Sequence, residues 1–134
     1  MLEREIIQNR GVENVVEGGE VTGFRFLVRM PNYRGVFARL IDGIEVRVGD
    51  LTWPREVPLW TLGGTQYTLA ELKAAHLDVH WDLDEPAVIT IPHAGGLAPG
   101  IHDIDVEIAI HAPYFPPPFR PSLFPSARKV TVIA

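Results

Sequence analysis

Histidine and aspartate residues near the middle of the chain stand at spacings that metal sites use. His76 and His80 are four residues apart, which would place both imidazoles on one face of a helix, as in many zinc sites. From residue 77 onward, however, apolar and polar residues alternate, which predicts that His80 lies on a strand and that the two rings diverge. His80, Asp82 and Asp84 would then share one strand face, where they could bind a cation or simply form a solvated acidic surface. A metal-dependent enzyme that uses His76, His80 and Asp82 is therefore one hypothesis.

The remaining histidines and the serines do not form a nucleophilic site. His102 and Asp103, with His111 further along, suggest a base and its orienting carboxylate, but adjacent residues on a strand point to opposite faces. Ser122 and Ser126 lack the Gly-x-Ser-x-Gly turn that exposes a nucleophilic serine. The sequence therefore argues against a serine hydrolase and contains no self-sufficient catalytic set.

Tyr33 and Arg34 are the strongest candidates for a binding surface. They lie in the segment Pro-Asn-Tyr-Arg-Gly-Val at residues 31–36, directly after a predicted strand. An aromatic ring beside a guanidinium can stack on a sugar or bind a carboxylate. A loop that only supports the neighbouring strands would also explain the segment, and both interpretations stay open.

Strands must position these residues, because alternation of apolar and polar residues with period two is the strongest local pattern. The pattern is broken near Gly11, and Leu27 is an apolar residue on an otherwise polar face. It predicts strands over residues 5–16, 23–30, 44–48, 57–62, 77–83, 87–91, 104–111 and 129–133. Many short strands separated by turns favour an all-β fold, an antiparallel β-sandwich of about eight strands with one short helix, formed by a single domain over residues 1–134.

Glycine marks the expected turns between these strands. Asp42-Gly43 and the glycine pairs at 18–19, 63–64 and 95–96 are typical of turns, and none of the pairs has the spacing of a phosphate-binding loop. The segment Gly-Leu-Ala-Pro-Gly at 96–100 is typical of a corner that carries the chain from one sheet of a sandwich to the other.

The single helix is predicted from its N-terminal cap. Thr68 and Glu71 have the capping-box spacing, in which each side chain can bond the backbone amide of the other residue. The return of period two after His76 predicts that the helix ends near that residue.

A proline-rich segment at residues 113–125 differs from the rest of the chain. Its prolines favour an extended conformation without amide donors. It also carries large apolar side chains that a solvent-facing loop should not have: Tyr114, Phe115, Phe119, Leu123 and Phe124. We therefore expect the segment either to fold over an open sheet edge or to bury against another chain.

The composition argues against several classes of function. There is no cysteine for a disulfide, a thiolate zinc site or a nucleophile. The formal net charge is −5, and Lys73 is the only lysine or arginine between residues 56 and 119, against nine acidic residues, so nucleic acid and anionic membranes are poor partners. The sequence has no apolar run of about 18 residues and no apolar leader at its start, so we expect a cytoplasmic protein.

The order of several segments resembles the small β-subunit of bacterial C-glycoside deglycosidases. The resemblance covers nearly the whole chain, and its sequential order matters more than any one piece. It rests on Val-Thr-Gly-Phe at 21–24, on residues 31–36, on 64–72, on 95–100, and on Tyr-Phe-Pro at 114–116.

The resemblance implies a β-sandwich that assembles with a larger, TIM-barrel-like α-subunit similar to sugar isomerases. In that family the complex cleaves the carbon–carbon bond between a 3-oxo-sugar and an aromatic aglycone. A divalent metal, with manganese the expected ion, and the acid and base residues belong to the partner, so no cofactor and no catalytic residue is expected on this chain. By likeness, the partner- or substrate-facing residues would be Tyr33, Arg34, Tyr114, Phe115, Phe119 and Phe124, with the 3-oxo-C-glycoside at or near the interface.

A different class of function also fits the sequence. The chain could be a stand-alone carbohydrate- or ligand-binding β-sandwich module that uses Tyr33 and Arg34. The β-subunit hypothesis predicts no turnover by the chain alone, whereas the module hypothesis predicts saturable sugar binding by the monomer.

Overall fold

The computed structural model describes residues 5–31, 35–75, 79–111 and 121–133. Within these ranges the chain forms eleven strands, one α-helix and one 3-10 helix. The elements are β1 (Glu13–Glu17), β2 (Glu20–Val28), β3 (Val36–Phe37), η1 (Ala38–Leu40), β4 (Ile41–Val48), β5 (Leu51–Trp53), β6 (Leu59–Leu62), β7 (Thr65–Tyr67), α1 (Leu69–Lys73), β8 (His80–Trp81), β9 (Ala87–Pro92), β10 (Gly100–Ile110) and β11 (Ser122–Val132).

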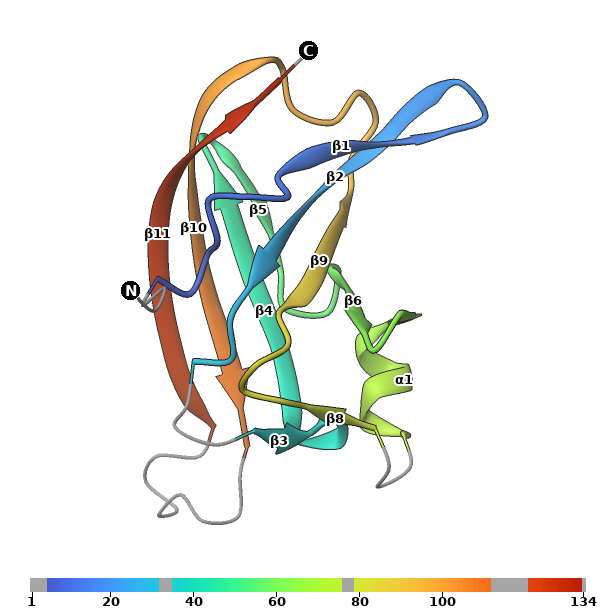
Figure 1. Ribbon diagram of the computed structural model, residues 1–134, viewed down its shortest axis with the longest axis vertical. Helices are drawn as coiled ribbons and strands as arrows, with labels where there is room; N and C mark the ends of the chain where they lie inside the picture. The colour runs from blue at the N-terminus through green and yellow to red at the C-terminus, as the bar shows by residue number, and fades with distance from the viewer. Residues whose placement is uncertain (1–4, 32–34, 76–78, 112–120, 134) are drawn as a thin grey trace.

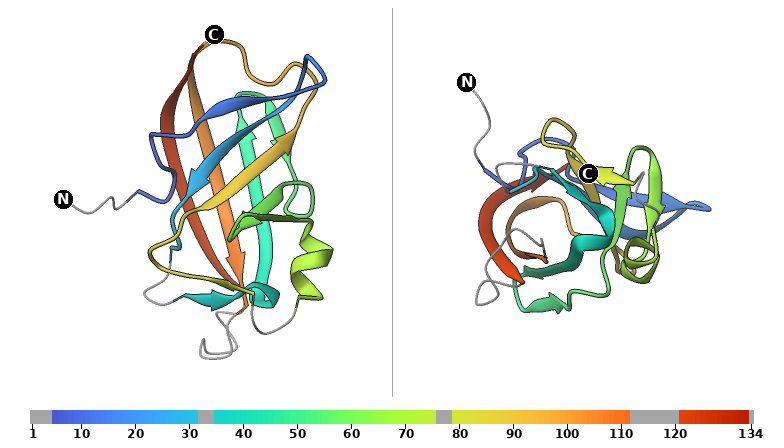
Figure 2. Two further views of the ribbon diagram at one scale, coloured as in Figure 1. Left: turned by 45° about the vertical axis from the view of Figure 1, so that its right-hand side comes forward. Right: turned by 90° about the horizontal axis from the view of Figure 1, so that it is seen from below.

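Two antiparallel sheets face each other and enclose the core. One sheet has the strand order β1-β2-β9-β6-β7, the other has the order β11-β10-β4-β5, and β3 and β8 form a short pair at one end (Figure 1). The two larger sheets curve around a shared interior (Figure 2). Phe24 of β2 and Trp53 of β5 meet in this interior with ring centroids 5.4 Å apart. The expected all-β sandwich is therefore confirmed.

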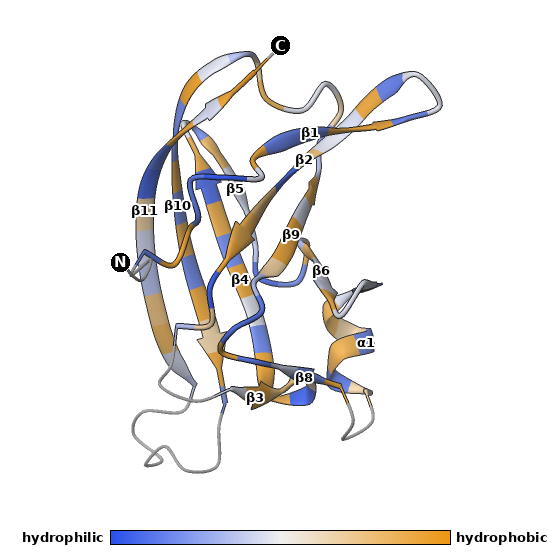
Figure 3. Cartoon of the chain, viewed as in Figure 1, coloured by the Kyte–Doolittle hydropathy of each residue, from blue (hydrophilic) through white to orange (hydrophobic). Residues whose placement is uncertain are grey.

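Period-two alternation places the core residues as expected. Phe24, Phe26 and Val28 of β2 are fully buried, and Arg25 and Leu27 between them lie on the outer face. The same division into inner apolar and outer polar residues runs along β4 and β10 (Figure 3). Burying apolar surface stabilises a fold by about 25 cal/mol per Å². The buried inner face is therefore the main stabilising feature of this fold.

The N-terminal strand is interrupted where the sequence predicts a break. Ile7 forms an isolated bridge with Val28, and the chain pairs with β2 again only from Glu13. Gly11 lies between these two pairings with φ of 76°. The Arg128 guanidinium of β11 donates to the Ile7 carbonyl oxygen over 2.9 Å, which links this N-terminal segment to the second sheet.

Two of the expected glycine turns are tight hairpins. Gly18 and Gly19 join β1 to β2, and Gly63 and Gly64 join β6 to β7, all four with positive φ. This conformation favours glycine and matches the twist of two-residue hairpins. Asp42-Gly43 is different, because both residues lie inside β4 and not in a turn before it. Gly43 is nevertheless needed there, since a Cβ atom would lie 2.6 Å from the Arg55 carbonyl oxygen.

The corner at residues 96–100 joins the two sheets, as the sequence predicts, because it connects β9 of one sheet to β10 of the other. The side chain of Asn14 holds it in place. Its amide donates to the Leu97 carbonyl oxygen and its carbonyl accepts from the Leu97 amide, each over 2.9 Å. These two bonds position the Leu97 side chain in the core.

The helix begins as predicted and ends early. Thr68 accepts a hydrogen bond from the Glu71 amide, and the Glu71 carboxylate accepts one from the Thr68 amide, so the capping box is complete. The helix ends at Lys73, with Ala74 as its C-cap, before the expected end at His76, which lies outside the described residues.

The end of the proline-rich segment belongs to a strand. Leu123, Phe124 and Pro125 lie in β11, which begins at Ser122, seven residues earlier than the predicted strand at 129–133. Pro125 can occupy this position because β11 is an edge strand, where a missing amide donor breaks no bond to a second neighbour. The short strands β3, β5 and β7 were not predicted.

Candidate functional site

The described residues that flank the sequence-predicted binding segments lie at one end of the sandwich (Figure 1). Tyr33, Arg34, Tyr114, Phe115 and Phe119 themselves lie outside the described residues. Described residues near the two segments are hydrogen-bonded to each other: the His111 amide donates to the Leu40 carbonyl oxygen over 2.8 Å. Residue 111 precedes the proline-rich segment, and residue 40 ends η1, which follows β3. We call the region formed by β3, η1, β8 and residues 82 and 111 the β3–β8 end; it lies at the bottom of Figure 1.

A chain of ring and charge contacts runs across the β3–β8 end. The Arg39 guanidinium lies 5.9 Å from the centre of the Phe37 ring. The Phe37 ring meets the His80 imidazole edge to face, with centroids 5.2 Å apart. His80 Nδ1 lies 2.6 Å from an Asp82 carboxylate oxygen. We call these four residues, Arg39, Phe37, His80 and Asp82, the array. Phe37 is 39% exposed, so the array presents an aromatic surface flanked by a cation and an anion.

Gly35, the first described residue after Arg34, lies close against β8. A Cβ atom at Gly35 would lie 2.5 Å from the Trp81 carbonyl oxygen and 2.6 Å from His80 Cε1. Both distances are shorter than real Cβ contacts, so only glycine lets the chain pass this close to β8. The residue after Arg34 is therefore held directly against His80 and Trp81.

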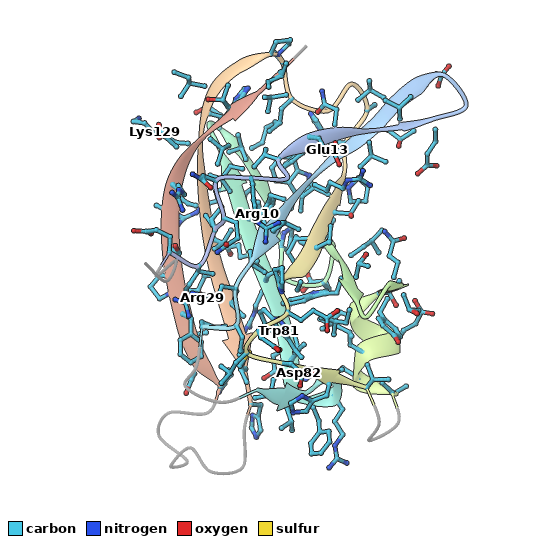
Figure 4. The ribbon with its side chains drawn as sticks, viewed as in Figure 1. Arg10, Glu13, Arg29, Trp81, Asp82 and Lys129 are labelled. Atoms are coloured by element: carbon cyan, nitrogen blue, oxygen red, sulfur yellow. The ribbon has the colours of Figure 1, made fainter. Side chains whose placement is uncertain are left out.

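Trp81 anchors the β3–β8 end to the core. Its side chain is fully buried, and it packs edge to face on Trp60 with ring centroids 5.4 Å apart. Its indole Nε1 donates to the Glu85 carbonyl oxygen over 3.0 Å, and its backbone pairs with Val36 of β3. Figure 4 shows Trp81 pointing into the molecule next to Asp82 on the same strand end.

A second polar cluster lies beside the array. The Asp42 carboxylate binds the Lys73 ammonium of α1 and lies 3.9 Å from His111 Nδ1. Burial lowers the pKa of Lys73 from its ordinary value of 10.5, because the ammonium is partly removed from water. The adjacent carboxylate keeps the ammonium paired, so the cluster ties α1 to the start of β4.

The other candidates from the sequence are not brought together. His102 Nε2 lies 2.6 Å from the Ala98 carbonyl oxygen, whereas Asp103 binds Lys129, so the two are not a base and its carboxylate. Within the described ranges, no three His, Asp or Glu side chains come close enough to hold a metal ion, which leaves the His80, Asp82 and Asp84 cation site unformed. His76 lies outside those ranges.

Phe124 is the one predicted interface residue that the structure describes. It lies in β11, is half-buried and packs against the core. Two residues of the array, Phe37 and Arg39, were not predicted. The only feature of the sequence that could have pointed to them is that they closely follow the segment at residues 31–36.

Comparison with known proteins decides the family. The profile of the family described as "C-glycoside deglycosidase beta subunit" matches residues 2–114. The chain belongs to this family. The match contains β3, η1, β8, β10 and the first two residues of the proline-rich segment, so it spans the whole β3–β8 end.

Three similar proteins carry the same family name. The C-glycoside deglycosidase beta subunit of Eubacterium cellulosolvens is 34% identical over 132 residues, covering 92% of this chain and 84% of the relative. Those of Microbacterium trichothecenolyticum and Arthrobacter globiformis are 30% and 29% identical, over 65% and 66% of this chain. These two alignments span 65% of each relative's own length. The described part of the chain contains no helix long and apolar enough to cross a membrane.

Proposed function

We propose that this chain is the non-catalytic β-subunit of a heteromeric C-glycoside deglycosidase, a lyase of carbohydrate metabolism. The observation that carries the proposal is the family match over residues 2–114, joined by the Eubacterium alignment over 92% of the chain. The partner is a larger, TIM-barrel-like α-subunit. The role of this chain is to complete and stabilise the partner's site.

The reaction under this proposal is cleavage of the carbon–carbon bond between a 3-oxo-sugar and its aglycone. The 3-oxo group acidifies the neighbouring C2–H, so a base can remove that proton and the aglycone can leave by elimination. A divalent metal on the α-subunit, with manganese the expected ion, would polarise the sugar oxygens. Acid and base groups are assigned to the α-subunit, because the described residues of this chain offer no convergent set for the reaction.

The β3–β8 end is the proposed contact with the α-subunit. Both candidate segments, with Tyr33, Arg34, Tyr114, Phe115 and Phe119, are attached there by described residues that touch. The array adds Phe37 and Arg39, and aromatic and arginine side chains are the types enriched in protein interfaces. Phe124 packs against the core of this chain. We therefore propose that it mainly supports the proline-rich segment and contacts the partner only secondarily.

A reconstitution assay tests this assignment. The chain alone, the copurifying larger polypeptide alone and the two together would each be incubated with a 3-oxo-C-glucoside, and release of the aglycone would be followed by chromatography. We expect release only when both polypeptides are present. Release by this chain alone, or equal release after it is omitted, would contradict the proposed role.

A further inference from the structure

The outer face of the five-stranded sheet carries a groove that the proposed function does not use. Two adjoining hollows of ≈ 420 Å³ and ≈ 330 Å³ lie on this face. Arg25, Gln66 and Thr90 line both of them, so they form one continuous depression. The lining comes from β1, β2, β6, β7 and β9 and the residues beside them, a different surface from the β3–β8 end. We call this depression the outer groove.

Arg25 in the outer groove is held in an ion pair, and Glu17, which lines the larger hollow, adds a further carboxylate. The Arg25 guanidinium donates from Nε and Nη2 to one Glu13 carboxylate oxygen, over 2.8 and 2.5 Å. Figure 4 shows Glu13 on β1, along the margin of this sheet. Because the pair neutralises the guanidinium, a phosphate or another anion gains little here. The remaining guanidinium hydrogens and the second carboxylate oxygen still offer donors and acceptors to a neutral ligand.

An apolar strip runs beside these polar groups. Leu27 pairs with Val88 across β2 and β9, and both side chains lie on the outer face, half-buried. Leu59 adds to the strip at the larger hollow. Leu27 is the residue that breaks the alternation of its strand, and its place in the groove gives that exception a purpose. Thr90 on the central strand β9 lies between Arg25 of β2 and Leu59 of β6, in the row next to Leu27 and Val88. The outer groove is therefore amphiphilic.

We propose that the outer groove binds a neutral saccharide. A pyranose presents apolar C–H groups on one face and hydroxyl groups around its edge, which matches a surface where apolar and hydrogen-bonding side chains lie side by side. The Gln66 amide and the Thr90 hydroxyl each provide donors and acceptors for sugar hydroxyls. The site is separate from the proposed interface, so it stands or falls independently of the β-subunit role.

A titration of the full-length chain tests this proposal. Amide chemical shifts would be followed by NMR while D-glucose and then a disaccharide are added. We expect saturable shifts confined to the outer groove, with a dissociation constant on the order of 1 mM. Gln66→Ala and Thr90→Val should each weaken binding about fivefold, the loss of one net hydrogen bond.

Matched controls separate the site from general effects. Thr131→Val makes the same change on the outer face of the other sheet and should leave binding unchanged. Inorganic phosphate should cause no saturable shift at the groove. Absence of saturation up to about 100 mM sugar, or equal weakening by Thr90→Val and Thr131→Val, would overturn the proposal.

Discussion

Replacing Trp81 with alanine is expected to lower the free energy of unfolding by about 3–5 kcal/mol, the usual cost of removing a fully buried large aromatic side chain. The substitution removes the edge-to-face contact with Trp60 and the hydrogen bond to the Glu85 carbonyl oxygen. It also takes away the support behind Gly35 and His80, so we expect the variant to lose affinity for the α-subunit. Urea unfolding followed by circular dichroism, and copurification with the partner, measure the two effects.

Trp53→Ala is the matched control for this prediction. Trp53 lies in β5 and packs on Phe24 and His93, away from the β3–β8 end. It should cost comparable stability yet leave partner binding intact under conditions where both variants are folded. A loss of less than about 1 kcal/mol in Trp81→Ala would show that the indole is not packed as described. Equal loss of partner binding in both variants would argue against the β3–β8 end as the interface.

The second large effect is expected at the corner between the sheets. Gly96→Ala should lower the free energy of unfolding by about 3 kcal/mol, from backbone strain of about 1 kcal/mol and two lost hydrogen bonds of about 1 kcal/mol each. Gly96 has φ of 58°, and a Cβ atom there would lie 2.3 Å from the Asn14 side-chain oxygen. The alanine therefore displaces the amide that holds Leu97.

Gly18 provides an unusually close control, because it has the same φ of 58° and nothing within 4 Å of its would-be Cβ atom. Gly18→Ala should cost only the strain, about 1 kcal/mol. In an Asn14→Ala background, Gly96→Ala should cost less than it does in the native chain, because its main obstacle is gone. Equal costs for the two glycine variants, or additive costs with Asn14→Ala, would contradict this account of the corner.

Much of the architecture could be predicted because it rests on local rules. Alternation with one buried face located eight of the strands, and it found the long strand β10 with its start placed four residues too late and its end one residue too far. The hairpin glycines were predictable because positive φ at both central positions excludes most other residues. The capping box was predictable because its two bonds link residues three apart.

Features that depend on non-local pairing could not be predicted. The strands β3, β5 and β7 are two or three residues long, too short to show a period. A β-bulge between Val15 and Val16 shifts the register, and this shift places Glu13 opposite Arg25 in the outer groove. A regular hairpin would pair Glu13 with Phe24 instead. The start of β11 was missed because prolines argue against a strand unless the strand is known to lie at an edge.

The partner-facing role of the two candidate segments stays a prediction from the resemblance and the side-chain types. Nothing in the sequence indicated that the described residues beside these segments lie together. This arrangement of the described residues depends on the hydrogen bond from the His111 amide to the Leu40 carbonyl oxygen and on the close approach of Gly35 to Trp81. Gly35 and Trp81 are far apart in the sequence, and their contact follows from the pairing of β3 with β8.

The central claim is that this chain works as one subunit of a larger enzyme, and the mass of the native particle tests it most directly. The chain would be tagged in the cells that naturally produce it and purified under mild conditions. The mass of the purified particle would be measured by light scattering coupled to gel filtration. We predict a particle that contains a second, larger polypeptide and far exceeds the chain's own 14.9 kDa. A stable 14.9 kDa monomer that binds no α-subunit when one is supplied would contradict the account.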